Sequence, residues 1–151
     1  MEDREDEFAM AGTGRNAMQR TAMTAIYDAL TYISMGQEVD VEGIVSALFD
    51  DKPYQDCDYF VKACLIMAIK EYAPLVKMLN DHMNHWTFDR LNRVEQAILL
   101  LSCVHYLYVE PEVEKAVVIN IAIKLSKAYL GDNDYKFVNA ILDKVLVRED
   151  A

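Results

Sequence analysis

The sequence predicts an all-α protein, and two observations support this prediction. Long segments repeat apolar residues at intervals of three and four, the spacing that places side chains on one face of a helix. Only five glycines and three prolines occur in the 151 residues, so the periodic segments have few breaks. We expect six or seven helices, and this number in one chain implies two packed helical layers rather than a simple up-and-down bundle.

The first 14 residues differ from the rest in charge. They hold five acidic residues and one arginine, a composition typical of a segment that cannot build a core. We therefore expect a disordered acidic tail at 1–14 and one helical domain at 15–148. The whole chain has a formal net charge of −10, which opposes indiscriminate binding to nucleic acid but leaves room for a small local site.

Two helices are predicted at the beginning of the domain. Apolar residues over 16–35 form one stripe, and Gly36 can close that helix. A shorter helix over 41–49 follows Asp40, whose side chain can cap it. Pro53 then ends this region.

Residues 56–84 predict two consecutive helices. The apolar spacing is helical throughout, but Pro74 has no amide hydrogen and restricts the residue before it. We expect the break near Tyr72. Trp86 follows in a turn, and we expect its ring to anchor the core rather than to serve as a stacking platform.

The next helix is predicted over residues 93–108. Thr87 can start a single helical turn before it, and Asn92 followed by Glu95 matches the spacing of a capping box. We expect one face of this helix to be buried. That face carries Val94, Ile98, Leu101 and His105.

Two more helices complete the domain. Pro111 breaks the preceding helix, and a helix over 114–130 is expected to stop at Gly131. Asp134 begins the last helix. Its apolar stripe consists of Phe137, Val138, Ile141, Leu142 and Val145.

The sequence holds no motif for catalysis. Phosphate-binding glycine loops, dinucleotide-binding motifs and nucleophile elbows are absent, and no residue stands out for a catalytic role. Cys57, Cys64 and Cys103 form no C-x-x-C pair, so we expect buried reduced thiols rather than a disulfide or a metal site. We expect no enzyme activity, no metal and no cofactor.

Nothing in the sequence predicts a membrane protein. The longest apolar stretch, residues 97–109, is too short to span a bilayer. The acidic N-terminus also lacks the basic segment and the apolar core of a signal peptide. We therefore expect a cytoplasmic protein with no membrane partner and no DNA partner.

Three blocks in the second half of the chain resemble the NusB family of transcription antitermination factors. They read WTFDRLNRVEQAILLL, PEVEKAVVINIAIKLSKAY and KFVNAILDKV, in the family's order. The resemblance covers about residues 15–146 and implies one all-helical domain of two packed three-helix bundles. The matching positions are Trp86, Arg90, Leu91, Val94, Glu95, Ile119, Asn120, Ala122, Phe137, Val138, Asn139 and Leu142.

The resemblance implies a binding function rather than catalysis. Members of the family bind the boxA element of nascent ribosomal RNA transcripts together with NusE, a ribosomal small-subunit protein, within the transcription elongation complex. By this resemblance we expect an antitermination factor with boxA-type RNA, NusE and the elongation complex as partners. The alternative is a diverged helical module that has lost RNA binding and works through protein contacts alone.

The family's RNA surface falls on two places in this chain. Its basic N-terminal edge falls on residues 15–20, where Arg15 occupies an expected basic position and Arg20 stands where an acidic or other polar residue is usual. The start of its last helix corresponds to Lys136 and Phe137. The ring of Phe137 can stack on an unpaired base, and core packing is an equal alternative. Tyr27 is the candidate contact for the protein partner, against the alternative of a half-buried aromatic.

Two asparagines of the matching blocks, Asn120 and Asn139, are expected to link helices through buried hydrogen bonds, since an unsatisfied buried amide costs about 1–3 kcal/mol. Other positions depart from the family pattern. His105 and Ile121 stand where glutamate is usual. Asp134 flanks the expected phosphate site and opposes an anion there by at most about 1 kcal/mol.

Overall fold

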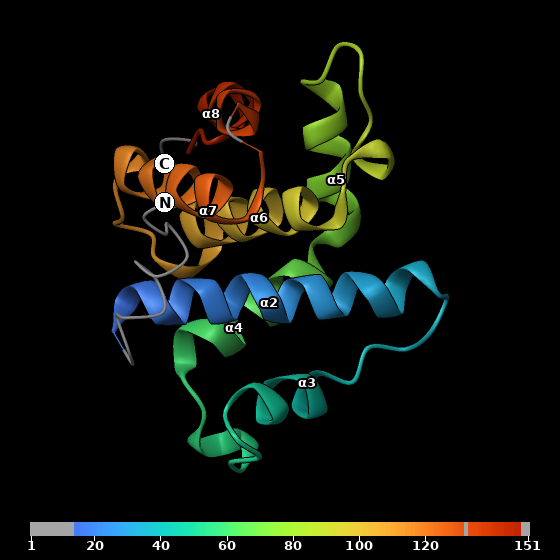
Figure 1. Cartoon of the computed structure of the whole chain (residues 1–151), viewed down its shortest axis with the longest axis vertical. Helices are drawn as coiled ribbons and strands as arrows, with labels where there is room; N and C mark the ends of the chain where they lie inside the picture. The colour runs from blue at the N-terminus through green and yellow to red at the C-terminus, as the bar shows by residue number, and fades with distance from the viewer. Residues whose placement is uncertain (1–13, 132, 149–151) are drawn as a thin grey trace.

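The computed structural model describes residues 14–131 and 133–148, so most of the expected acidic tail at 1–14 lies outside the described residues. The prediction of an all-α fold with about seven helices is confirmed for the described residues (Figure 1). The α-helices are α2 Arg15–Ser34, α3 Val41–Leu48, α4 Tyr59–Lys70, α5 Tyr72–Asp81, α6 Arg93–Val104, α7 Lys115–Tyr129 and α8 Asp134–Val145. The short turns are η1 Tyr54–Asp56, η2 Phe88–Arg90 and η3 His105–Val109.

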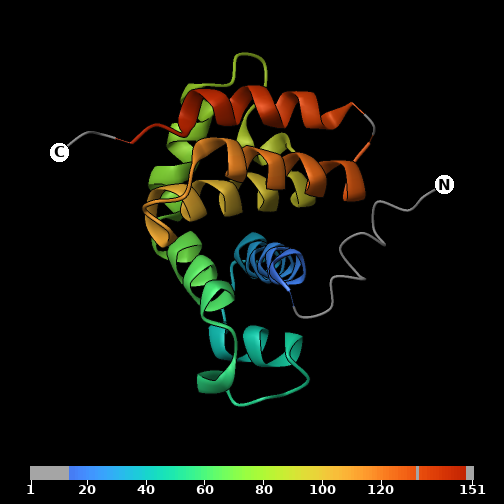
Figure 2. The same ribbon diagram turned by 90° about the vertical axis from the view of Figure 1, so that its left-hand side faces the viewer.

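Six of the seven α-helices form two groups of three, with α2, α3 and α4 in one group and α6, α7 and α8 in the other. Figure 2 shows α6, α7 and α8 stacked on one side of α2, which is seen end-on, with α3 on the other side of it. Helix α4 packs along α2 and also reaches α6, while α5 contacts α8. This arrangement agrees with the two packed bundles that the resemblance implies.

Helix α6 lies at the centre of the core. Eight consecutive residues, 97–104, are buried. Helices α2 and α4 cover α6 from one group, and α7 and α8 cover it from the other. A helix that is apolar on every side must be covered on every side, so α6 holds the two groups together.

Local sequence signals set several helix ends as predicted. Asp40 and Asn92 each accept a hydrogen bond from the amide three residues later, at 3.1 and 2.9 Å. Gly36 follows α2 with a φ of +69°, a conformation that glycine adopts without steric cost. The break between α4 and α5 falls at Glu71, next to the predicted position at Tyr72.

The predicted helix over 93–108 ends early, because η3 replaces its last turn. In this π-helical turn the amide of Glu110 donates to the carbonyl of His105, five residues back, at 3.0 Å. The guanidinium of Arg148 donates to the carbonyls of Tyr106 and Glu110 at 2.9 and 3.1 Å. The C-terminal segment thereby satisfies carbonyls at the end of a turn that is wider than an α-helix.

Gly131 does not stop α7 in the predicted way. The backbone is already extended at Leu130, with φ −121° and ψ −176°, and Gly131 has no positive φ. The amide of Gly131 instead donates to the carboxylate of Asp134 at 2.9 Å. Gly131 is therefore tied to the start of α8 rather than to the end of α7.

Phe88, and not Trp86, anchors the turn between α5 and α6. The prediction of a buried Trp86 is wrong, because this residue is 48% exposed whereas Phe88 is 0% exposed. Turn η2 directs the ring of Phe88 inward, where it meets Tyr72 edge-on with 6.2 Å between ring centroids. The Phe88 amide donates to Asn80 at 2.7 Å, and its carbonyl accepts from Gln96 at 2.7 Å.

The prediction that Asn120 and Asn139 are buried is also wrong, because both residues are exposed. Each lies on a helix that buries one narrow stripe and leaves the neighbouring positions in solvent. The two asparagines fall outside these stripes and cannot serve as buried links. The stripes are Val118, Ala122, Leu125 and Ser126 on α7, and Val138, Ile141, Leu142 and Val145 on α8.

The three cysteines are buried, as predicted. Burial raises the pKa of Cys103 to about 12, so this thiol stays protonated near neutral pH and is a poor nucleophile. Within residues 14–131 and 133–148, no three His, Cys, Asp or Glu side chains are grouped to hold a metal ion. The helices of these ranges include none that is long and apolar enough to cross a membrane.

Replacing Phe88 with Ala is expected to lower the free energy of unfolding by about 3–5 kcal/mol, the usual cost of deleting a buried aromatic ring. Trp86→Phe is the matched control, and we expect a change below about 1 kcal/mol because the indole is half exposed. Urea denaturation followed by far-UV circular dichroism measures both. A larger loss for Trp86→Phe than for Phe88→Ala would contradict the assignment of the anchor.

Candidate functional site

The two parts of the predicted RNA surface lie at opposite ends of α6. Arg15, at the start of α2, pairs with Glu110 beyond η3, with 3.1 Å between nitrogen and oxygen. Phe137, at the start of α8, shares a pocket with Glu95 in the first turn of α6. The 12 residues of α6 separate these places by about 18 Å at 1.5 Å per residue. The fold therefore does not gather Arg15 and Lys136 into one basic patch.

Arg15 is held by contacts within the chain. Its guanidinium bonds to Glu110 and lies 6.0 Å from the ring centre of Phe60. The side chain is nevertheless 68% exposed, and an exposed ion pair of this kind contributes only about 0–1 kcal/mol. A phosphate group can replace Glu110 as the partner of Arg15 at small cost.

Glu110 also bonds to His105, one of the two positions at which the resemblance leads us to expect glutamate. The ring nitrogen Nε2 of buried His105 lies 2.5 Å from a carboxylate oxygen of Glu110. Burial lowers the pKa of His105 more than its hydrogen bond with Glu110 raises it. Burial acts to raise the pKa of Glu110, but the hydrogen bond with His105 and the charge of Arg15 bring it below its usual value. The carboxylate of Glu110, five residues after position 105, therefore faces His105.

The remaining predicted residues differ in their surroundings. Arg20 is partly buried on α2, and Lys136 is exposed in the first turn of α8. Tyr27 is half-buried, and the guanidinium of Arg93 lies 5.8 Å from the centre of its ring. Arg93 also donates to the hydroxyl of Thr31 at 3.2 Å. The part of Tyr27 that can meet a partner is therefore limited by Arg93.

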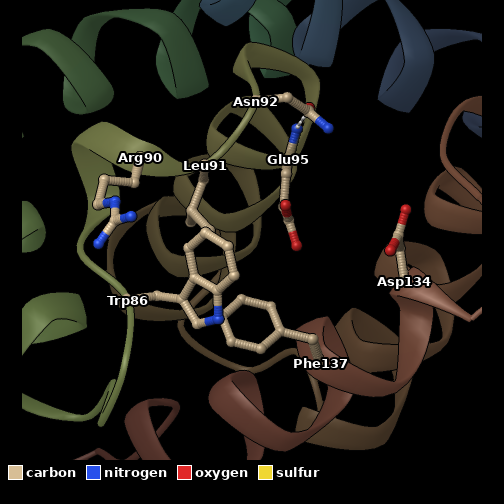
Figure 3. Close-up of a pocket in the computed structure, with 7 residues that line it drawn as sticks. All are labelled: Trp86, Arg90, Leu91, Asn92, Glu95, Asp134 and Phe137. Carbon is tan, nitrogen blue, oxygen red and sulfur yellow. Dashed lines mark hydrogen bonds between the residues drawn. The ribbon is translucent and has the colours of Figure 1, made fainter.

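A pocket of about 430 Å³ opens between the starts of α6 and α8 (Figure 3). The side chains of Trp86 and Phe137 both line it. The carboxylates of Glu95 and Asp134 project into the space from different helices and face each other across the opening. The lining residues are Trp86, Arg90, Leu91, Asn92, Glu95, Asp134 and Phe137.

Part of the Phe137 ring packs on the core, and the rest lines this pocket. Of the two interpretations left open by the sequence, packing therefore has direct support. The pocket itself was not foreseen, because Trp86 was predicted to be buried and Glu95 was considered only as part of a helix cap. One sequence signal did point to this pocket, because Trp86 and Glu95 lie in one of the three NusB-like blocks and Phe137 lies in another.

Neither carboxylate of the pocket is paired with a cation of the described residues, although Arg90 lines the same pocket. Among residues 14–131 and 133–148, neither Glu95 nor Asp134 takes part in an ion pair, and Arg90 lies instead 5.5 Å from the ring centre of Trp86. Burial, and to a smaller extent the charge of Asp134, raises the pKa of Glu95 to about 7. Part of the Glu95 population is therefore protonated at neutral pH.

Replacing Glu95 with Gln is expected to raise stability at pH 8 relative to the unchanged protein. The pKa of Glu95 is raised from 4.5 to about 7 in the folded protein. The stabilisation of the folded state by the protonated side chain is therefore complete below pH 4.5 and is lost as the pH rises through 7. Gln does not ionise, so its advantage grows with pH, to the order of 1 kcal/mol for a half-exposed group. Urea denaturation at pH 5 and pH 8 measures the difference. Equal gains at both pH values, or the same trend in the exposed control Glu112→Gln, would contradict it.

Comparison with known proteins identifies the family. The model of the NusB family matches residues 16–147. Transcription antitermination protein NusB of Finegoldia magna is 28% identical over 137 residues, which cover 90% of this chain and 96% of that protein. The protein of the same name from Treponema denticola is 37% identical over 86 residues, covering 57% of this chain and 62% of its own length.

A solved structure agrees with the fold. T. maritima NusB superposes with a TM-score of 0.71 at 22% identity, over 89% of this chain and 91% of the other. At this identity the likeness supports the fold alone. Together with a family model that spans almost all of the described domain, it leads to one conclusion: the chain belongs to the NusB family.

Proposed function

We propose that this protein acts in transcription antitermination, as the names of its relatives state for them. It binds boxA-type RNA together with the ribosomal protein NusE in the cytoplasm, as part of the elongation complex, and it has a binding role rather than a catalytic one. The observation that carries this proposal is the match of the family model to residues 16–147.

The proposed phosphate contacts are Arg15, Arg20 and Lys136. Lys136 is exposed in the first turn of α8, where the positive end of the helix dipole also favours an anion. Arg15 contributes after exchanging Glu110 for a phosphate oxygen. Phe137 offers a base only the part of its ring that faces the pocket, where two carboxylates oppose the phosphate of the same nucleotide. The three cations are therefore the main RNA contacts in this proposal.

A second function, binding of protein partners without RNA, is favoured by the separation of these cations. Arg15 is paired with Glu110, and the length of α6 lies between it and Lys136. The chain around them carries a net charge of −10, which weakens long-range attraction of RNA. In this alternative the exposed part of Tyr27 contributes to a protein contact and the cations have no RNA to bind.

Titration of boxA-like RNA with the protein, alone and with NusE, separates the two functions. We expect binding with NusE present, and we expect Arg15→Ala/Arg20→Ala and Lys136→Ala each to weaken it severalfold and to reduce its salt dependence, because each lost phosphate contact lowers the salt slope. Lys144→Ala, an exposed lysine at the other end of α8, is the matched control and should leave binding unchanged.

The outcomes are distinct. Binding of NusE without any RNA binding would establish the protein-only function. RNA binding that persists at full strength in both the double variant and Lys136→Ala would overturn the proposed contacts. Tyr27→Ala is expected to weaken NusE binding, and an unchanged affinity would remove Tyr27 from the partner surface.

A further inference from the structure

Helix α4 is apolar on two opposite faces, and only one of them is buried. The buried face consists of Val61, Cys64, Leu65 and Ala68. The opposite face consists of Tyr59, Ala63, Ile66 and Met67, which follow one another at the spacing of a single helical stripe. A surface helix ordinarily carries polar residues opposite its buried stripe, so the second apolar face of α4 calls for a further partner.

This second face lines a groove of about 420 Å³ together with two neighbouring turns. Tyr54 of η1 and Tyr108 and Val109 of η3 complete the lining. Among the described residues of the groove, Tyr59, Ile66 and Tyr108 are 75%, 42% and 41% exposed. Single exposed apolar side chains are ordinary, but a patch that three elements build together marks an interaction site.

The charged residues on this face of α4 are both cations. Lys62 lines the groove, and Lys70 lies on the same face eight residues later, which is about 12 Å along the helix axis at 1.5 Å per residue. Neither lysine forms an ion pair with a described residue. The described residues that line the groove include no acidic one, although the whole chain has a net charge of −10.

Lys62 is held at the edge of the groove by Tyr54. Its ammonium group donates to the carbonyl of Tyr54 at 3.2 Å and lies 4.9 Å from the centre of the tyrosine ring. An ammonium group has three donors, and a second one reaches the carbonyl of Gln55 at 3.5 Å. One donor of Lys62 is therefore left for a carboxylate from another molecule.

We propose that this groove binds an amphipathic helix of a protein partner. Apolar side chains on one stripe of that helix pack among Tyr59, Ile66 and Tyr108. Carboxylates at the edges of the same stripe pair with Lys62 and Lys70. A helix is the matching shape, because the apolar face runs along α4 and helices pack by placing the side-chain ridges of one into the grooves of the other.

The same features disfavour two other occupants. Single-stranded RNA would stack on the tyrosines, but it needs a row of cations for its phosphates and leaves the aliphatic side chains without apolar cover. A second copy of this chain in a two-fold contact would place Lys62 and Lys70 against the same lysines of its partner, and like charges repel. The repulsion of an acidic helix by the net charge of the chain is screened beyond about 8 Å at physiological salt, so the two lysines decide the local preference.

A labelled probe helix tests the proposal, with fluorescence anisotropy as the measurement on the full chain. The probe is an alanine-rich peptide of about 18 residues, long enough to form a helix, with a leucine stripe edged by glutamates. One control peptide has lysines in place of the glutamates, and another has the same composition in an order that forms no stripe. We expect a dissociation constant in the micromolar range for the probe, and binding about tenfold or more weaker for either control.

Protein variants test the apolar and the charged parts of the groove separately. Ile66→Ala and Lys70→Glu are each expected to weaken binding of the probe about fivefold or more. The matched controls lie on α7, and both should bind the probe as the unchanged protein does. Val117→Ala removes a side chain with the same exposed fraction as Ile66, and Lys124→Glu reverses the charge of an exposed lysine. Far-UV circular dichroism checks that all four variants keep their helix content.

Four results would overturn the proposal. They are no saturable binding of the probe, equal binding of either control peptide, unchanged binding by both Ile66→Ala and Lys70→Glu, and equal weakening by the two α7 controls. Two more results would overturn it by assigning the groove to another occupant. A dimer in sedimentation that Ile66→Ala dissociates would assign it to a second copy, and displacement of the probe by a single-stranded RNA oligomer would assign it to RNA. The inference is separate from the proposed RNA contacts, because neither Lys62 nor Lys70 is one of them.

Discussion

Burial of α6 on all sides is the constraint on which the rest of the structure depends. Eight consecutive residues, 97–104, are buried, so α6 has no solvent-facing stripe and requires helices from both groups to cover it. Helices α2 and α4 supply one half of that cover, and α7 and α8 supply the other. The two bundles are therefore parts of one core, and the ends of α6 define where surface chemistry can occur.

The two ends of α6 carry different electrostatics. At its C-terminal end, η3 brings Glu110 between His105 and Arg15, and cation and carboxylate compensate each other. At its N-terminal end, Glu95 and Asp134 line one pocket, and neither carboxylate is ion-paired within the described part of the chain. Because a rigid helix of 12 residues lies between them, the two clusters do not merge. At the C-terminal end of α6, Glu110 interrupts the expected basic surface by pairing with Arg15. At the N-terminal end, Glu95 and Asp134 form an acidic pocket.

Features that depend on neighbouring residues were predicted well. The caps at Asp40 and Asn92, the left-handed Gly36 and the break beside Tyr72 each follow from interactions within a few residues. Burial of single side chains was predicted less well. Trp86 and Asn120 lie outward although their residue types or surroundings favour burial, because the path of the chain and the facing helix decide which side is covered.

The sequence by itself determined the fold class, several helix boundaries and the family, because periodicity, capping residues and ordered motif blocks are local properties of the chain. Only the tertiary structure decided which predicted residues meet. It joined Trp86 and Glu95 to Phe137 in one pocket and kept Arg15 apart from Lys136. The physical reason is that such distances are set by the packing of α2 and α8 around α6, and spacing along a chain does not report contacts between separate helices.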